Sequence, residues 1–143
     1  MIFATLDTHL PHAPDLAAAA VPPGLLFAWC ANMRLLAPAV EEAFATELLR
    51  LRVREAKGSE VLVATGGELT SEMLNPDGQR FLGGYHTRFD DDYRDVFGAD
   101  IYAVADNWAS YDRLAPVRTR RLLGKPPGKS RSLGDRVRAW LGR

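Results

Sequence analysis

Three consecutive aspartates, Asp90, Asp91 and Asp92, form the densest group of acidic side chains in this sequence. We place them on a helix that carries Phe81 on its apolar face and advances about 100° per residue. Asp90 and Asp91 then point to solvent, whereas Asp92 lies among the apolar side chains. An unpaired buried charge costs on the order of several kcal/mol, so Asp92 needs a cation or a hydrogen-bond donor. The pattern predicts that Asp92 is a structural anchor.

A catalytic role is the alternative interpretation of the same region. In it, Asp92 acts with His86 and Trp108 as the active site of an enzyme. His86 and Asp90 are four residues apart, which makes them neighbours on a helix and a possible pair of metal ligands. This spacing matches no strong metal-binding motif, and the glycine pairs lack the spacing of a phosphate-binding loop. We therefore assign no catalytic residue and expect no metal and no cofactor.

The single cysteine, the N-terminal residues and the length of the apolar runs indicate the cellular compartment. Cys30 alone excludes an intrachain disulfide, which suits a reducing environment, and in its apolar stretch it is expected to act as a small hydrophobic side chain. The N-terminus has no basic region before an apolar run, so no secretory signal is expected. The apolar stretch from Leu25 to Leu36 is too short to span a bilayer. These features predict a cytoplasmic protein.

Charge is divided unevenly along the chain, although the formal net charge is zero. Residues 1–116 hold 17 of the 18 acidic and 9 of the 18 basic side chains, a net charge of −8, and residues 117–143 carry +8. Such asymmetry indicates a charged partner, an anionic surface, or a basic tail that lies on its own acidic body. The residues expected to contact a protein partner are Asp90, Asp91, Asp95, Arg118, Arg120, Arg121, Arg136, Arg138 and Trp140.

Residues 117–143 are predicted to be a basic linker followed by a short amphipathic helix. Pro126-Pro127-Gly128 is typical of a linker, and from Leu133 onward Trp140 shares one side of a helical wheel with aliphatic residues, flanked by arginines. So short a helix is not stable alone in water, so it needs a surface. That surface is the acidic body, a protein partner or, in a peripheral contact, a membrane. Nucleic acid is the least favoured partner because the acidic body repels phosphates.

The spacing of apolar residues predicts a mainly α-helical fold. A chain of 143 residues suits one domain, which we expect to be a compact multi-helix domain over residues 1–116 with at most a minimal β element. Short strands are expected at Ile2–Leu6 and Ile101–Val104. The run from Glu60 to Thr65 fits either a buried strand or a short helix.

Prolines, glycines and capping residues predict where the helices begin and end. Helices are expected from Val21 to Ala37, from Pro38 to Arg54, and from Gln79 to Phe97 with Gly98 as its cap. A last helix begins after Asp106 or Asn107, carries Trp108, and is interrupted by Pro116. Asp106 and Trp108 are expected to have structural polar roles, as Asp92 does.

Several short motifs resemble, in order and spacing, a family of small bacterial proteins classed as a domain of unknown function. They are Leu26-Phe27-Ala28-Trp29-Cys30, Leu74-Asn75-Pro76-Asp77-Gly78-Gln79-Arg80-Phe81, Tyr85, Asp92-Tyr93, Tyr102 and Asp106-Asn107-Trp108-Ala109-Ser110-Tyr111. The resemblance covers roughly residues 5–115. It implies a mostly helical single domain and brings no established catalytic residues.

The leading hypothesis is therefore a small cytoplasmic bacterial protein that binds another protein and is not an enzyme. Small families of this kind are often immunity or accessory proteins of bacterial toxin systems, and this analogy gives the hypothesis its most concrete form. An acidic face suits a basic partner because complementary charge speeds encounter and disfavours other partners.

Overall fold

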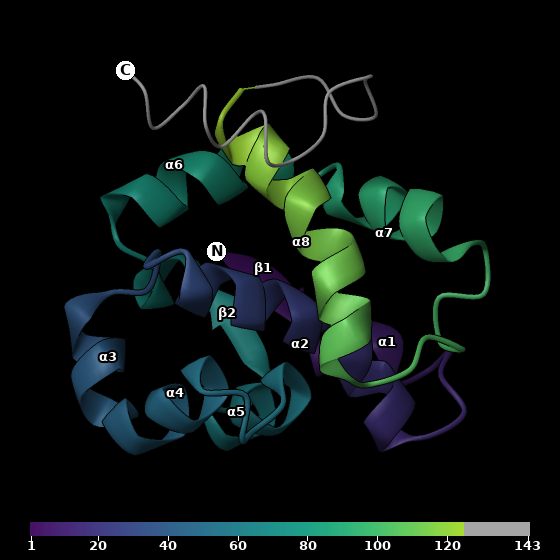
Figure 1. Ribbon diagram of the computed structural model, residues 1–143, viewed down its shortest axis with the longest axis horizontal. Helices are drawn as coiled ribbons and strands as arrows, with labels where there is room; N and C mark the ends of the chain where they lie inside the picture. Colours follow the sequence, from purple (N-terminus) through teal and green to yellow (C-terminus); the bar gives the residue numbers. More distant parts are fainter. Residues whose placement is uncertain (125–143) are drawn as a thin grey trace.

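The computed structural model describes residues 1–124 and is mainly helical, as the sequence predicts (Figure 1). Its elements in chain order are β1 (Ile2–Thr5), α1 (Leu6–His9), α2 (Leu16–Asn32), α3 (Pro38–Ala43), α4 (Ala45–Arg52), α5 (Gly58–Ala64), β2 (Glu68–Thr70), a 3-10 turn (Ser71–Met73), α6 (Pro76–Tyr85), α7 (Phe89–Phe97) and α8 (Trp108–Leu122). The expected linker at Pro126-Pro127-Gly128 and the helix from Leu133 lie outside the described residues.

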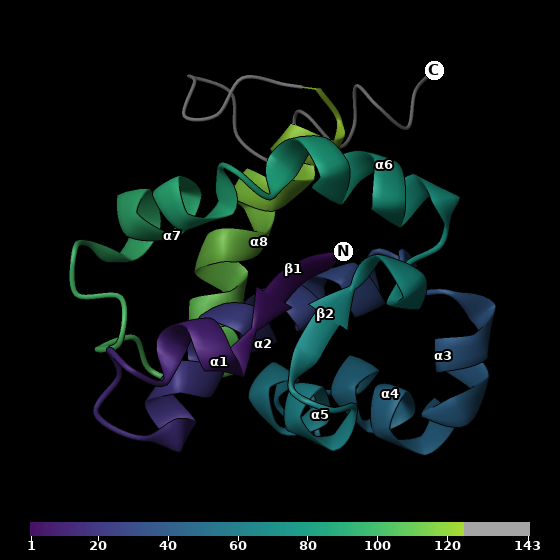
Figure 2. The same ribbon diagram turned by 180° about the vertical axis from the view of Figure 1, so that it is seen from behind.

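Helix α2 is the centre of the molecule. It is buried without interruption from Ala19 to Ala31, since apolar side chains occupy every side of it. In both ribbon views it lies, with the strands, between a group formed by α3, α4 and α5 and a group formed by α6, α7 and α8 (Figures 1 and 2). Of the large apolar side chains around it, Phe27, Trp29, Leu48 and Tyr85 are buried in the core, whereas Phe44, Phe81, Phe89 and Trp108 are partly buried and pack against the core.

The start of α2 differs from the expected start at Val21. Asp15 caps the helix by accepting a hydrogen bond from the backbone N–H of Ala18 at 2.8 Å, so the helix begins at Leu16. Pro22 and Pro23 therefore lie inside the helix, where each removes a backbone donor. Burial on all sides holds the helix together through both prolines.

Two glycines let α2 and α5 pack closely. A Cβ on Gly24 would lie 2.6 Å from the backbone nitrogen of Ser59, and a Cβ on Gly58 would collide with the carbonyl oxygen of Gly24. Only hydrogen atoms fit between the backbones here. The run from Glu60 to Thr65, which fitted either a strand or a helix, is helical up to Ala64, and Thr65 is the C-cap of α5.

A two-stranded antiparallel sheet joins β1 to β2, with Ala4 opposite Leu69 and Thr5 opposite Glu68. The strand at the N-terminus confirms the expected β element. Strand β2 follows a turn at Gly66 and Gly67, whose φ angles of 111° and 79° belong to the region that favours glycine. The expected strand at Ile101–Val104 is wrong, because that stretch forms turns between α7 and α8.

The helix expected from Gln79 to Phe97 is divided into α6 and α7 by the turn between Tyr85 and Phe89. Helix α6 begins earlier than expected, because the side chain of Asn75 caps it by accepting from the backbone N–H of Gly78 at 2.8 Å. At the far end of α7, Gly98 has a φ of 92° and closes the helix, as predicted.

Helix α8 continues through Pro116 to Leu122, which corrects the expected interruption. Pro116 deprives the carbonyl of Asp112 of its helical donor, but Asp112 is exposed, so water can satisfy that oxygen. Asn107, not Asp106, caps the helix by accepting from the backbone N–H of Ser110 at 2.9 Å. Residues 117–122, which we assigned to the basic extension, are thus part of a helix of the body. Within residues 1–124, no helix is both long and apolar enough to cross a membrane.

Candidate functional site

Helix α7 exposes three of the residues expected to meet a partner. Asp90, Asp91 and Asp95 are all exposed, and no ion pair within residues 1–124 involves any of them. Asp91 and Asp95 are four residues apart and adjacent on the helix surface, where like charges repel. We call Asp90, Asp91 and Asp95 the acidic face of α7.

Asp92 points the other way and fastens α7 to the rest of the domain. It is 2% exposed. It accepts a hydrogen bond from the Tyr85 hydroxyl at 2.8 Å and a two-point contact from Arg121, with Nε at 3.1 Å and NH2 at 2.9 Å. Asp92 is thus buried and holds two partners, one on α6 and one on α8. Burial raises the pKa of Tyr85, so its hydroxyl keeps the proton that it donates to Asp92.

Arg121 and Arg118, two of the basic residues expected to meet a partner, turn inward. Arg121 is committed to Asp92, and only 23% of its side chain is exposed. Arg118 is 1% exposed, so it cannot reach a partner surface, and this corrects its assignment. Both lie on the side of α8 that packs against α7, since the helix does not stop at Pro116. Arg120 is half-buried, and Arg136, Arg138 and Trp140 lie outside the described residues.

Arg118 lines a partly enclosed pocket of about 70 Å³ between β1, α1, α2, α7 and α8. Phe3, Pro22, Pro23 and Phe89 form its apolar wall, and Thr5, Thr8, His9 and Asp90 add polar groups. The Nε of Arg118 is buried and has no hydrogen-bond partner. The spacing of Tyr111, Leu114 and Arg118 along one helical face is the sequence signal that would have placed Arg118 inside, had α8 been extended through Pro116.

His9 forms the second polar side of this pocket. Its Nδ1 is 2.9 Å from the Tyr102 hydroxyl, and the two rings meet edge to face. Burial lowers the pKa of His9, and the Asp90 carboxylate acts in the opposite sense. His9 is therefore mostly neutral near neutral pH.

The residues of the expected enzyme site are held in three different places. The Nδ1 of His86 lies 2.9 Å from the Leu82 carbonyl oxygen, and its ring packs against Phe3. Trp108 packs against Tyr111 with the guanidinium of Arg54 over its ring at 4.7 Å. The small pocket that Trp108 lines includes neither Asp92 nor His86. Nothing in these contacts assembles an acid, a base and a substrate cavity at one point.

The remaining candidates have structural partners. Asp106 accepts a hydrogen bond from the Ser59 hydroxyl at 2.6 Å, which ties the start of α8 to α5. Cys30 is fully buried, and burial raises the pKa of its thiol to about 12, so it carries no reactive thiolate at neutral pH. Within the part of the chain that the structure describes, no group of three or more His, Cys, Asp and Glu side chains could hold a metal ion.

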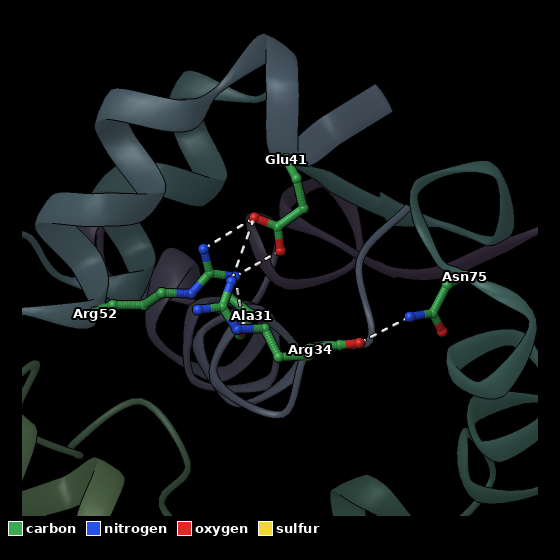
Figure 3. Close-up of polar contacts among 5 residues, drawn as sticks. All are labelled: Ala31, Arg34, Glu41, Arg52 and Asn75. Carbon is green, nitrogen blue, oxygen red and sulfur yellow. Dashed lines mark hydrogen bonds and ion pairs between the residues drawn. The ribbon is translucent and has the colours of Figure 1, made fainter. Parts of the chain in front are cut away.

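A second polar cluster, missed in the sequence, fixes the path from α2 to α3 and α6 (Figure 3). Arg52 donates hydrogen bonds to both carboxylate oxygens of Glu41, at 2.6 and 2.9 Å, and to the carbonyl oxygen of Ala31 at 2.8 Å. Arg34, in the left-handed region with φ of 58°, also faces Glu41, and its carbonyl accepts from Asn75 at 2.7 Å. Because every member is engaged by protein groups, we interpret the cluster as structural.

The fold and these contacts define a mainly helical domain with an acidic helix face. The chain belongs to the family whose model is the domain of unknown function DUF7832, which matches residues 5–105. This confirms the resemblance seen in the sequence. No curated protein and no solved structure matches the chain significantly.

Proposed function

We propose that this protein is a non-enzymatic protein-binding protein that docks a basic partner on the acidic face of α7. The proposal rests on the different burial and ion pairing of neighbouring aspartates. Asp92 is buried in an ion pair, whereas Asp90, Asp91 and Asp95 are exposed and engage no cation among residues 1–124. The anchor at Asp92 orients α7, so the face is presented in a fixed geometry.

Helix stability alone does not account for the acidic face. Asp90 and Asp91 lie in the first turn of α7, where the helix dipole favours negative charge. Asp95 lies in the last turn, where the dipole disfavours it, and it also repels Asp91. Arg94 is the only cation of α7 and pairs with none of them within 4 Å. A partner that brings positive charge would offset this repulsion.

A cytoplasmic role as an immunity or accessory protein of a bacterial toxin system is the most concrete form of the proposal. It is supported by analogy with other small families and by the suitability of an acidic face for a basic toxin. The neighbouring genes provide a first test of this form, because it expects a toxin gene beside this one, whereas a metabolic operon would argue against it.

The binding test compares two variants that remove the same charge from different surfaces. The first carries D90N, D91N and D95N on the acidic face. The control carries D7N, E42Q and E55Q, which are exposed on α1, α3 and the loop after α4. Tagged proteins expressed in the native host are cross-linked and purified. We expect one basic protein to bind the wild type and the control, and to bind the α7 variant at least tenfold more weakly. Equal binding by both variants would refute the proposal.

A further inference from the structure

An open hollow lined by arginines lies where the end of α6 meets the end of α8 (Figures 1 and 2). It measures about 240 Å³. Its charged lining residues are Arg80 on α6, Arg88 in the turn after α6, and Arg121 on α8. No acidic side chain of residues 1–124 lines it. The other lining residues are Phe81, Gly84 and Tyr85.

Two of the three guanidinium groups have a carboxylate partner outside the hollow. Arg121 is paired with the buried Asp92, which holds it in place. Arg80 pairs with Asp77 at 3.0 Å, but both side chains are largely exposed, and a surface pair of this kind is weak enough for a stronger anion to replace it.

Arg88 supplies the positive charge that these carboxylates leave over. It is exposed and takes part in no ion pair within residues 1–124. Asp90 and Asp91 follow it closely along the chain, but neither lines the hollow or approaches its guanidinium within 4 Å. An anion that enters the hollow therefore meets three arginines and no lining carboxylate of the described residues.

Gly84 keeps the hollow open between Arg80 and Arg88. These three residues follow one another at intervals of four, so they lie along one side of α6 and the turn after it. Glycine weakens a helix relative to alanine. A Cβ on Gly84 would meet nothing within 4 Å, so packing among residues 1–124 does not require a glycine here. The missing side chain instead leaves room between two exposed guanidinium groups.

We propose that this hollow binds a phosphomonoester, with phosphate oxygens accepting N–H groups of Arg80 and Arg88 and the organic part against Phe81. A phosphate monoester carries close to two negative charges and three terminal oxygens, so two guanidinium groups can contact it together. A carboxylate has one charge and two oxygens. The Phe81 ring stacks on Tyr85 at 5.0 Å, which gives the hollow a fixed apolar wall that suits a flat substituent. This site is separate from the acidic face of α7.

NMR titration of the backbone amide signals of the full chain tests the site, with phenyl phosphate as the probe and ionic strength held constant. We expect the signals of residues 80–88 to shift and saturate, with a dissociation constant of about 1 mM or below. Benzoate keeps the ring but has one charge, and inorganic phosphate lacks the ring, so each should bind at least about fivefold more weakly. AMP and O-phosphotyrosine, titrated in the same way, distinguish a nucleotide from a phosphorylated tyrosine as the source of the phosphate.

Two pairs of matched variants locate the binding. R88Q should weaken phenyl phosphate binding about tenfold, whereas R94Q, which removes an exposed arginine outside the hollow, should change it by less than about twofold. G84L fills the space between the guanidinium groups and should abolish binding. G83L adds the same side chain outside the hollow and should preserve binding. Both glycine variants should fold, because neither added Cβ meets an atom within 4 Å.

Three results would overturn the inference. They are a linear, non-saturating response up to about 10 mM phenyl phosphate, equal binding by R88Q and R94Q, and equal binding by G84L and G83L. No protein partner is present in these titrations, so their outcome is independent of the protein-docking proposal.

Discussion

Replacing Asp92 by alanine should remove the contacts that hold α7 against α6 and α8, and so destabilise the fold. The change leaves the Tyr85 hydroxyl without its acceptor in a buried site, which costs about 1–3 kcal/mol. It also removes the pair with Arg121, whose side chain is 23% exposed, so water recovers part of its solvation and the further loss is below about 1 kcal/mol. We therefore expect the free energy of unfolding to fall by about 1–4 kcal/mol.

Urea denaturation measures this loss, with D91A as the matched control. Asp91 is the adjacent residue of the same helix, is exposed and makes no ion pair within residues 1–124, so D91A should change the free energy of unfolding by less than about 0.5 kcal/mol. The urea midpoint of D92A should drop while the slope m stays unchanged. D92N keeps an oxygen for Tyr85 and should lie between the two. Equal midpoints for D92A and D91A would refute the assignment of Asp92 as the anchor.

Three more predictions test the remaining structural claims. G58A should lower the free energy of unfolding by about 1–3 kcal/mol or more, because the added Cβ collides with α2. G83A, whose Cβ meets nothing within 4 Å, should leave the free energy of unfolding unchanged or raise it. Equal urea midpoints for the two variants would argue against the close packing of α2 and α5. Cys30 should react with a thiol reagent only in denaturant, and rapid reaction of the native protein would contradict its burial. The hydrogen bond from Arg52 lowers the pKa of Glu41 below 4.5, so this carboxylate stabilises the fold above pH about 4.5 and stops doing so as the pH falls through its folded pKa. E41Q should therefore lose less stability on acidification than the wild type, and identical plots of stability against pH would contradict this.

The side of α7 that faces inward was predictable from the sequence because it depends on local periodicity. Asp92 is three residues from Phe89, so the two share one face of α7 even though the longer helix we expected is divided. The cap at Gly98 and the helix beginning at Pro38 were predictable for the same local reason. These features need no knowledge of distant contacts.

What the sequence did not reveal depends on contacts between distant residues. Strand β2 spans three residues and exists because it pairs with β1, more than sixty residues earlier. Helices α2 and α8 continue through prolines that local rules treat as boundaries, since packing or exposure offsets the lost hydrogen bonds. Because we expected Pro116 to interrupt α8, we also missed that Arg118 faces inward and lines a pocket.

The central claim is that charge on the acidic face of α7 recruits a protein partner. Once the cross-linked partner is purified, the association rate constant should be measured by stopped flow at several salt concentrations. We expect the wild-type rate constant to fall steeply with salt concentration, and the chain carrying D90N, D91N and D95N to associate more slowly and with a weaker salt dependence. Superimposable salt dependences for the wild type and this variant would contradict it.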